Sequence, residues 1–166
     1  MGQLVFPNWI QILLILILVY LAYIDLLTFR LPDTITLPLI ALGLLIAGLT
    51  NQGLVSFQDA FIGAILGYGS LWILNYLYRI SKKQDGIGMG DAKLLAALGA
   101  WLGWSALPSV LFTASITGLL GGFFWLQWNQ RNPRSAFPFG PFLAIAGIIE
   151  LLWPQTLQTF LLSKLA

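Results

Sequence analysis

The chain has 166 residues, of which 58% are hydrophobic and 8% are charged, and its mean hydropathy is +0.87. Soluble domains carry about 25% charged residues, so this composition cannot cover a surface that faces water and predicts an integral membrane protein. The chain contains no histidine and no cysteine, which excludes Ser-His-Asp and Cys-His catalysis, disulfides and ordinary zinc or haem sites. Its net charge of +2 is too small to indicate a nucleic-acid partner.

Hydropathy divides the chain into six apolar segments, which predict an all-α, polytopic membrane protein with about six transmembrane helices in a single domain, residues 1–166. The first, Trp9 to about Leu27, would be about 28 Å long and would span a hydrocarbon core of about 30 Å. Neither a basic region nor a small-residue cleavage site marks it as a signal peptide. The other helices are expected at about 33–49, 57–78, 91–104, 108–128 and from 137 to a break near Pro154.

The third segment contains Gly63 and Gly67, four residues apart, and this spacing predicts close packing against another membrane helix.

The basic residues are expected on one side of the membrane. Positive charge in loops marks the cytosolic side, so the loops after the first, third and fifth helices are predicted in the cytosol and the N-terminus outside. Only Lys164 falls on the other side. The residues on the predicted cytosolic side are Arg30, Arg79, Lys82, Lys83, Lys93, Arg131 and Arg134.

Three alternating glycines, Gly86, Gly88 and Gly90, lead into Asp91 at the start of the fourth helix. Glycine lets another chain approach the backbone closely, and an aspartate beside a membrane helix is a functional candidate. A second acid, Asp25, lies in the last turns of the first helix. Both acids are expected at the cytosolic end of their helices and at one depth. We therefore predict that they form one hydrolytic pair.

The fourth helix supports a site within the membrane, because its 14 or so residues reach only about 21 Å. If its far end reaches the outer boundary, Asp91 begins below the cytosolic headgroups. Non-helical backbone at that depth must line a cavity, and Gly86 to Gly90 would supply this lining.

Peptide hydrolysis by two acids needs one ionised carboxylate to take a proton from water and one protonated carboxyl to donate to the carbonyl oxygen. Two close carboxyls do not both ionise easily, so a pair provides both states. No metal or other cofactor is needed for this step.

Structural roles are alternatives for each of these acids. Asp91 would also serve as a helix cap, and Asp25 would also pair with Lys93 or Arg30. Asp33 or Thr34 is expected to cap the second helix.

Two further acids lie near the predicted outer side. Asp59 is expected at the outer interface. Glu150 would be a further site or, as we prefer, would reach that interface or form hydrogen bonds between helices.

The chain resembles the type IV prepilin peptidases, the GxGD class of membrane aspartic proteases, from the first helix onward. The motif itself is Gly88-Met89-Gly90-Asp91, within a longer glycine-rich stretch that continues to Leu95. The other matching stretches are Asp25 with Pro32-Asp33-Thr34-Ile35-Thr36-Leu37-Pro38, then Leu98-Gly99-Ala100-Trp101-Leu102-Gly103-Trp104 and Pro138-Phe139-Gly140-Pro141-Phe142-Leu143-Ala144.

The resemblance implies an endopeptidase that removes the short basic leader of prepilins or pseudopilins at the cytosolic face of the bacterial inner membrane. It implies Asp25 and Asp91 as the catalytic pair, and we expect Gly86, Gly88, Gly90 and Lys93 to bind substrate or support the loop. The likeness is to a short form without the N-terminal cysteine-containing region of larger members, so methyltransferase activity is not assigned. The sequence leaves the oligomeric state open.

Two other functions use the same residues. The first is an intramembrane protease of the GxGD type that cuts within spanning helices. The second, less favoured, is a small proton-coupled carrier with Asp25, Asp91 and Glu150 as titrating groups. A carrier needs no docking site for an extended peptide, so the glycine-rich stretch favours a protease.

Overall fold

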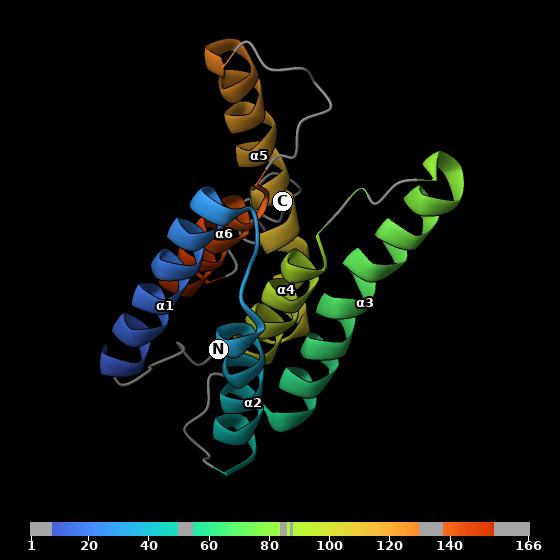
Figure 1. The fold of residues 1–166 in the computed structure, drawn as a ribbon. Helices are drawn as coiled ribbons and strands as arrows, with labels where there is room; N and C mark the ends of the chain where they lie inside the picture. Colours follow the sequence, from blue (N-terminus) through green and yellow to red (C-terminus); the bar gives the residue numbers. More distant parts are fainter. Residues whose placement is uncertain (1–7, 50–54, 84–85, 87, 130–137, 155–166) are drawn as a thin grey trace, which may run out of the picture.

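The computed structural model describes residues 8–49, 55–83, 86, 88–129 and 138–154, and within them it contains helices and no strand. The all-α prediction is confirmed. A 3-10 turn, η1, covers Trp104–Ala106. The helices are α1 Asn8–Thr28, α2 Asp33–Leu49, α3 Phe57–Lys82, α4 Met89–Leu102, α5 Leu107–Asn129 and α6 Gly140–Leu152 (Figure 1).

The helix α4 lies at the centre of the bundle, in contact with α2, α3 and α6 (Figure 1). From Leu94 onward it is apolar on all sides, which is the pattern of a helix surrounded by others. Leu94, Leu95 and Ala97 are fully buried. The indole N–H of Trp101 donates a 2.9 Å hydrogen bond to the Leu39 carbonyl and so joins α4 to α2. The helix that carries Asp91 is therefore held from several sides.

Small residues bring α3 and α4 into backbone contact. A Cβ atom on Gly63 would overlap the Gly99 carbonyl, and one on Gly67 would lie 2.6 Å from the Leu95 carbonyl oxygen. Glycine is required here because no other residue leaves room for the facing backbone. The expected role of the Gly63–Gly67 spacing is confirmed.

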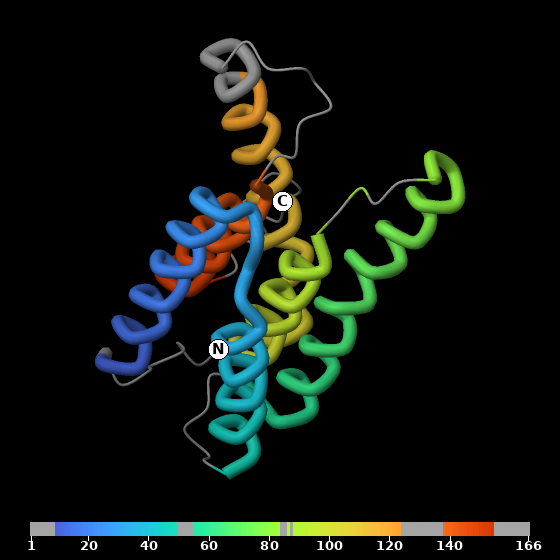
Figure 2. The backbone as a smooth tube through the Cα atoms, in the orientation of Figure 1, coloured from blue at the N-terminus to red at the C-terminus, as the bar shows by residue number. Residues whose placement is uncertain are grey.

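The helix α1 packs against α6, which also contacts α4 and α5. Leu18 and Leu21 of α1 are fully buried. The Gln11 side-chain amide donates to the Leu151 carbonyl at 3.2 Å. These contacts place the end of α1 beside the beginning of α6, as the tube in Figure 2 also shows.

By length and composition, three of the described helices can each cross a membrane, namely those over Trp9–Thr28, Phe57–Lys82 and Trp104–Phe123. The apolar helices α2 and α6 are shorter, and α4 has 14 residues, or about 21 Å. The expected shortness of the fourth helix is confirmed.

The ends of α1 and α3 and the beginning of α4 lie at the same end of the bundle (Figure 1). The basic residues Arg30, Arg79, Lys82, Lys83 and Lys93 therefore gather there, as the loop charges predict. Arg131, Arg134 and Lys164, with the segment expected after Pro154, lie outside the described residues.

Several predicted boundaries shift. The helix α3 continues to Lys82, four residues beyond the expected end, and α4 begins at Met89 rather than at Asp91. Gly90 is therefore helical. Of the segment expected to line the cavity with non-helical backbone, Gly86 and Gly88 are the described residues outside the helix.

The prediction that Asp33 or Thr34 caps the second helix is wrong. The helix starts at Asp33 itself, and the backbone N–H groups of Ile35 and Thr36 donate to the carbonyl of Pro32. The Asp33 carboxylate is instead bound to a lysine, as described below.

Candidate active site

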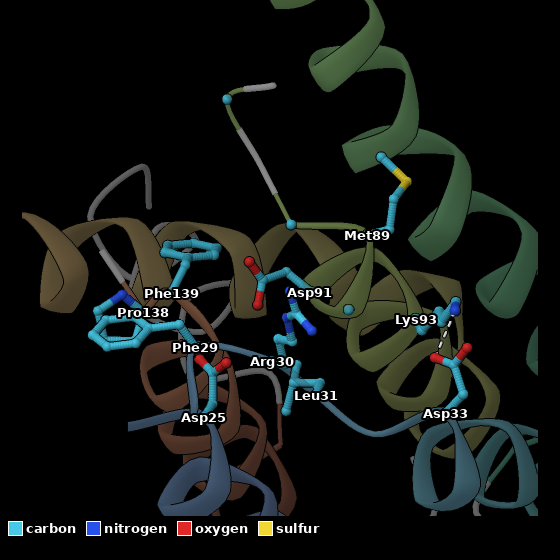
Figure 3. A pocket seen from close by; sticks show the side chains of 13 residues that line it. Asp25, Phe29, Arg30, Leu31, Asp33, Met89, Asp91, Lys93, Pro138 and Phe139 are labelled. Atoms are coloured by element: carbon cyan, nitrogen blue, oxygen red, sulfur yellow. Dashed lines mark hydrogen bonds and ion pairs between the residues drawn. The ribbon is translucent and has the colours of Figure 1, made fainter. Parts of the chain in front are cut away.

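A cavity of about 610 Å³ opens at the end of the bundle where α1 ends and α4 and α6 begin. Figure 3 shows its lining, with Asp25 and Asp91 supplied by different helices. All six residues predicted for the site line this one cavity. They are Asp25, Gly86, Gly88, Gly90, Asp91 and Lys93.

Asp25 lies in the last turn of α1 and is 4% exposed. Its Oδ2 atom is buried and accepts no hydrogen bond from the described residues. Buried polar atoms in proteins are nearly always hydrogen-bonded, so such an oxygen needs an explanation. Asp25 also lines the cavity, and the backbone of Gly140 lies against its carboxyl group.

The chain turns sharply after Asp25. The N–H of Phe29 donates to the Asp25 carbonyl at 2.8 Å, and Phe29 has a left-handed backbone with φ of 54°. This conformation is uncommon for a bulky residue and ends the helix. It directs the following residues, Arg30 and Leu31, along the cavity wall (Figure 3).

Asp91 is in the first turn of α4 and is 8% exposed. Its N–H donates to the carbonyl of Gly88, the N-cap residue, at 3.1 Å. A carboxylate is favoured at the positive end of a helix dipole, so α4 gains from Asp91 electrostatically. The alternative that Asp91 caps this helix is nevertheless wrong, because the N-cap residue is Gly88 and no side chain makes a cap hydrogen bond.

The two carboxyl groups are close enough for the charge of Asp25 to act on Asp91. Like charges at this range disfavour the state in which both are ionised, and the pair then titrates as a unit. Both carboxyl groups line the same cavity.

Gly140 was absent from the predicted site residues, although it lies within a stretch that carries the family resemblance. It opens α6, and a Cβ atom on it would lie 2.6 Å from Oδ2 of Asp25. A side chain there would push the carboxyl away. This contact could not be predicted from local sequence, because Gly140 and Asp25 are far apart in the chain.

Gly90 has a similar role for the opposite wall. A Cβ atom on this residue would lie 2.9 Å from Cβ of Leu31, in the connection between α1 and α2. The glycine lets that connection pass close to the start of α4. The walls that carry Asp25 and Asp91 are thereby brought together.

Lys93 lines the cavity, and its ammonium group binds the Asp33 carboxylate at 2.6 Å (Figure 3). This is the ion pair found among the described residues, and it joins α4 to α2. The alternative in which Asp25 pairs with Lys93 or Arg30 is therefore wrong. A direct role for Lys93 towards substrate stays a prediction.

Two further described acids, Glu150 and Asp59, are not among the residues that line the cavity. Glu150 is 4% exposed and accepts a 2.5 Å hydrogen bond from the Ser109 hydroxyl, so the expected hydrogen bond between helices is confirmed. Asp59 accepts hydrogen bonds from the Ser56 hydroxyl and the Trp104 indole N–H. In the part of the chain that the structure describes, no group of three or more acids gathers to hold a metal.

The fold and cavity define a polytopic helical membrane protein in which two buried carboxyl groups share one pocket. A family model described as "Type IV leader peptidase family" matches residues 12–123 of the chain. This match covers more than half of the chain, so the chain belongs to the type IV leader peptidase family.

Curated relatives agree. The chain is 45% identical over 161 residues to a prepilin leader peptidase/N-methyltransferase of Aeromonas hydrophila, covering 95% of this chain and 55% of that protein. Proteins with the same name from Pectobacterium carotovorum and Pseudomonas aeruginosa are 40% and 44% identical, covering 87% and 79% of this chain and 51% and 45% of their own. The chain thus spans about half the length of these relatives. No solved structure matches it.

Proposed function

We propose that this protein is a membrane aspartic endopeptidase that removes the short basic leader from type IV prepilins or pseudopilins. The observation that carries the proposal is the meeting of Asp25 and Asp91, both buried, at one cavity of about 610 Å³. Membership of the type IV leader peptidase family and relatives named as prepilin leader peptidases support this choice of substrate.

The pair would act on a water molecule held between the two carboxyls. The ionised carboxylate takes a proton from this water while the oxygen attacks the peptide carbonyl carbon, and the protonated carboxyl donates its proton to the carbonyl oxygen. Collapse of the tetrahedral intermediate breaks the C–N bond. The leaving amine takes the proton that the first carboxylate received, and the carbonyl oxygen returns its own.

The substrate would reach the cavity from the cytosolic side of the bacterial inner membrane. The basic residues around this end of the bundle support a cytosolic position, because such residues mark the inner side. A leader at the inner side and an apolar segment in the bilayer would place the bond between them beside the two acids. The relatives' names include an N-methyltransferase activity, which is not assigned to this chain.

Incubation of the purified protein in detergent with a prepilin fragment tests the function. The fragment should carry a basic leader followed by an apolar segment. We expect two products, cut at the end of the leader, and mass spectrometry of both gives the bond. A cut within the apolar segment would instead identify an intramembrane protease. No cleavage, together with pH-driven flux in liposomes, would support the carrier.

A further inference from the structure

The helix α3 presents a row of buried residues to its neighbours at four-residue intervals, Gly63, Gly67, Leu71 and Asn75. Residues spaced in this way lie on one side of a helix. The two glycines make backbone contact with α4. Figures 1 and 2 show that α3 and α4 separate towards the end of α3, so the later positions of the row have more space to fill.

The last residue of the row, Asn75, reaches the glycine-rich stretch. It is 5% exposed, and its side-chain oxygen accepts a 2.8 Å hydrogen bond from the N–H of Gly86. Tyr78 is one turn further along α3, and a Cβ atom on Gly86 would lie 2.6 Å from its ring. Asn75 and Tyr78 therefore hold Gly86 from the same helix, and Gly86 lines the cavity.

We propose that Asn75 is a positioning residue for substrate, acting through Gly86. The hydrogen bond fixes the backbone of the glycine-rich stretch at the cavity wall, where it would meet the main chain of an extended peptide. The expected effect of Asn75 on catalysis rests on the proposed peptidase function. The hydrogen bond itself can be tested by hydrogen–deuterium exchange, which does not require peptidase activity.

The kinetic test compares Asn75→Leu, which removes the acceptor at similar size, with Asn75→Asp, which keeps an oxygen in its place. We expect Asn75→Leu to raise KM for the prepilin fragment roughly tenfold, with a smaller change in kcat, because docking is impaired and the two acids remain. Asn75→Asp should restore most of the lost affinity. A variant that only loses folded protein would lower kcat at unchanged KM, which would overturn the positioning role.

The second test is hydrogen–deuterium exchange of a peptide containing Gly86, measured on the full chain in detergent. Loss of one hydrogen bond should speed exchange of its amide about three- to tenfold in Asn75→Leu and Asn75→Ala. Ser70→Ala is the matched control, since the Ser70 hydroxyl binds Gly67 within α3, and it should leave exchange unchanged.

The two tests separate the inference from the function. If the unsubstituted protein cleaves no prepilin but Asn75→Leu speeds amide exchange at Gly86, the peptidase function is refuted and the hydrogen bond from Gly86 to Asn75 is supported. If the protein cleaves and exchange at Gly86 is the same in all variants, the role of Asn75 is refuted.

Discussion

Two acids of this protein are equally buried and have very different surroundings. Asp25 and Glu150 are each 4% exposed. Asp25 lines the cavity and has the backbone of Gly140 against its carboxyl group, whereas Glu150 accepts a hydrogen bond from the Ser109 side chain between α5 and α6. Burial alone therefore does not distinguish a candidate catalytic acid from a structural one.

The difference comes from which elements meet at each acid. Glu150 lies within a helix that packs against its neighbour, so a hydroxyl from α5 can satisfy it. Asp25 lies where α1 ends and the chain turns, and its carboxyl group lies against the backbone of Gly140, which has no side chain. Four substitution experiments test this contrast, in order of decreasing effect.

Replacement of either acid of the pair should have the largest effect. Asp25→Asn and Asp91→Asn keep the size of the side chain but remove the group that accepts and donates the proton. We expect each to lower kcat by about a thousandfold or more, because the remaining acid cannot supply both states. The cleavage assay measures this, with size-exclusion chromatography to confirm folding. Wild-type kcat in either variant would refute the proposed pair.

Gly140→Ala should have the second largest effect. The added methyl group would overlap Oδ2 of Asp25 and displace the carboxyl. Because a shift of about 1 Å near reacting atoms can lower a rate about a hundredfold, we expect a 10- to 100-fold loss of kcat. Gly69→Ala, where the new atom meets open space, is the matched control and should cleave normally. Equal rates in both variants would show that Gly140 does not set the position of Asp25.

Removal of the Ser109 hydroxyl, which donates to Glu150, should lower the stability of the protein and leave its cleavage activity nearly unchanged. Ser109→Ala leaves a buried acid oxygen without its donor, which typically costs about 1–3 kcal/mol. We expect a lower melting temperature in detergent and kcat within about twofold of the unsubstituted protein. Glu150→Gln should also retain activity, because its side-chain oxygen can accept the same hydrogen bond. A large loss of kcat in a folded Glu150→Gln would mean that this acid takes part in function.

The ion pair between Lys93 and Asp33 should contribute least to stability. The Asp33 side chain is 56% exposed, and exposed pairs contribute about 0.2–1 kcal/mol. Asp33→Asn should therefore change the melting temperature only slightly, and this change should shrink at high salt. If Lys93→Gln then lowers cleavage far more than Asp33→Asn, Lys93 has a role beyond the pair.

Hydropathy and charge were sufficient to predict the part of the fold that local sequence determines. The approximate positions of the helices, their order and the shared end of Asp25 and Asp91 follow from apolar runs and the placement of basic residues. The contacts that shape the cavity could not be predicted this way. Gly140 meets Asp25, and Lys93 binds Asp33, only because helices distant in sequence pack together. Asn75 gave no signal either, since a single polar residue in an apolar helix has many uses.

The backbone contact at Gly63 holds the first part of α3 against α4, so a tilt of α3 about this contact moves the later part of the helix. Asn75 lies twelve residues further on, roughly 18 Å away at about 1.5 Å per residue. A tilt of about 5° about the contact would move Asn75 by about 1.6 Å, which exceeds what a hydrogen bond tolerates. A methyl group added at Gly63 would therefore weaken the hydrogen bond between Asn75 and Gly86, although Asn75 lies more than three helical turns away. The close packing of α3 on α4 thus helps to set the position of a residue that lines the cavity.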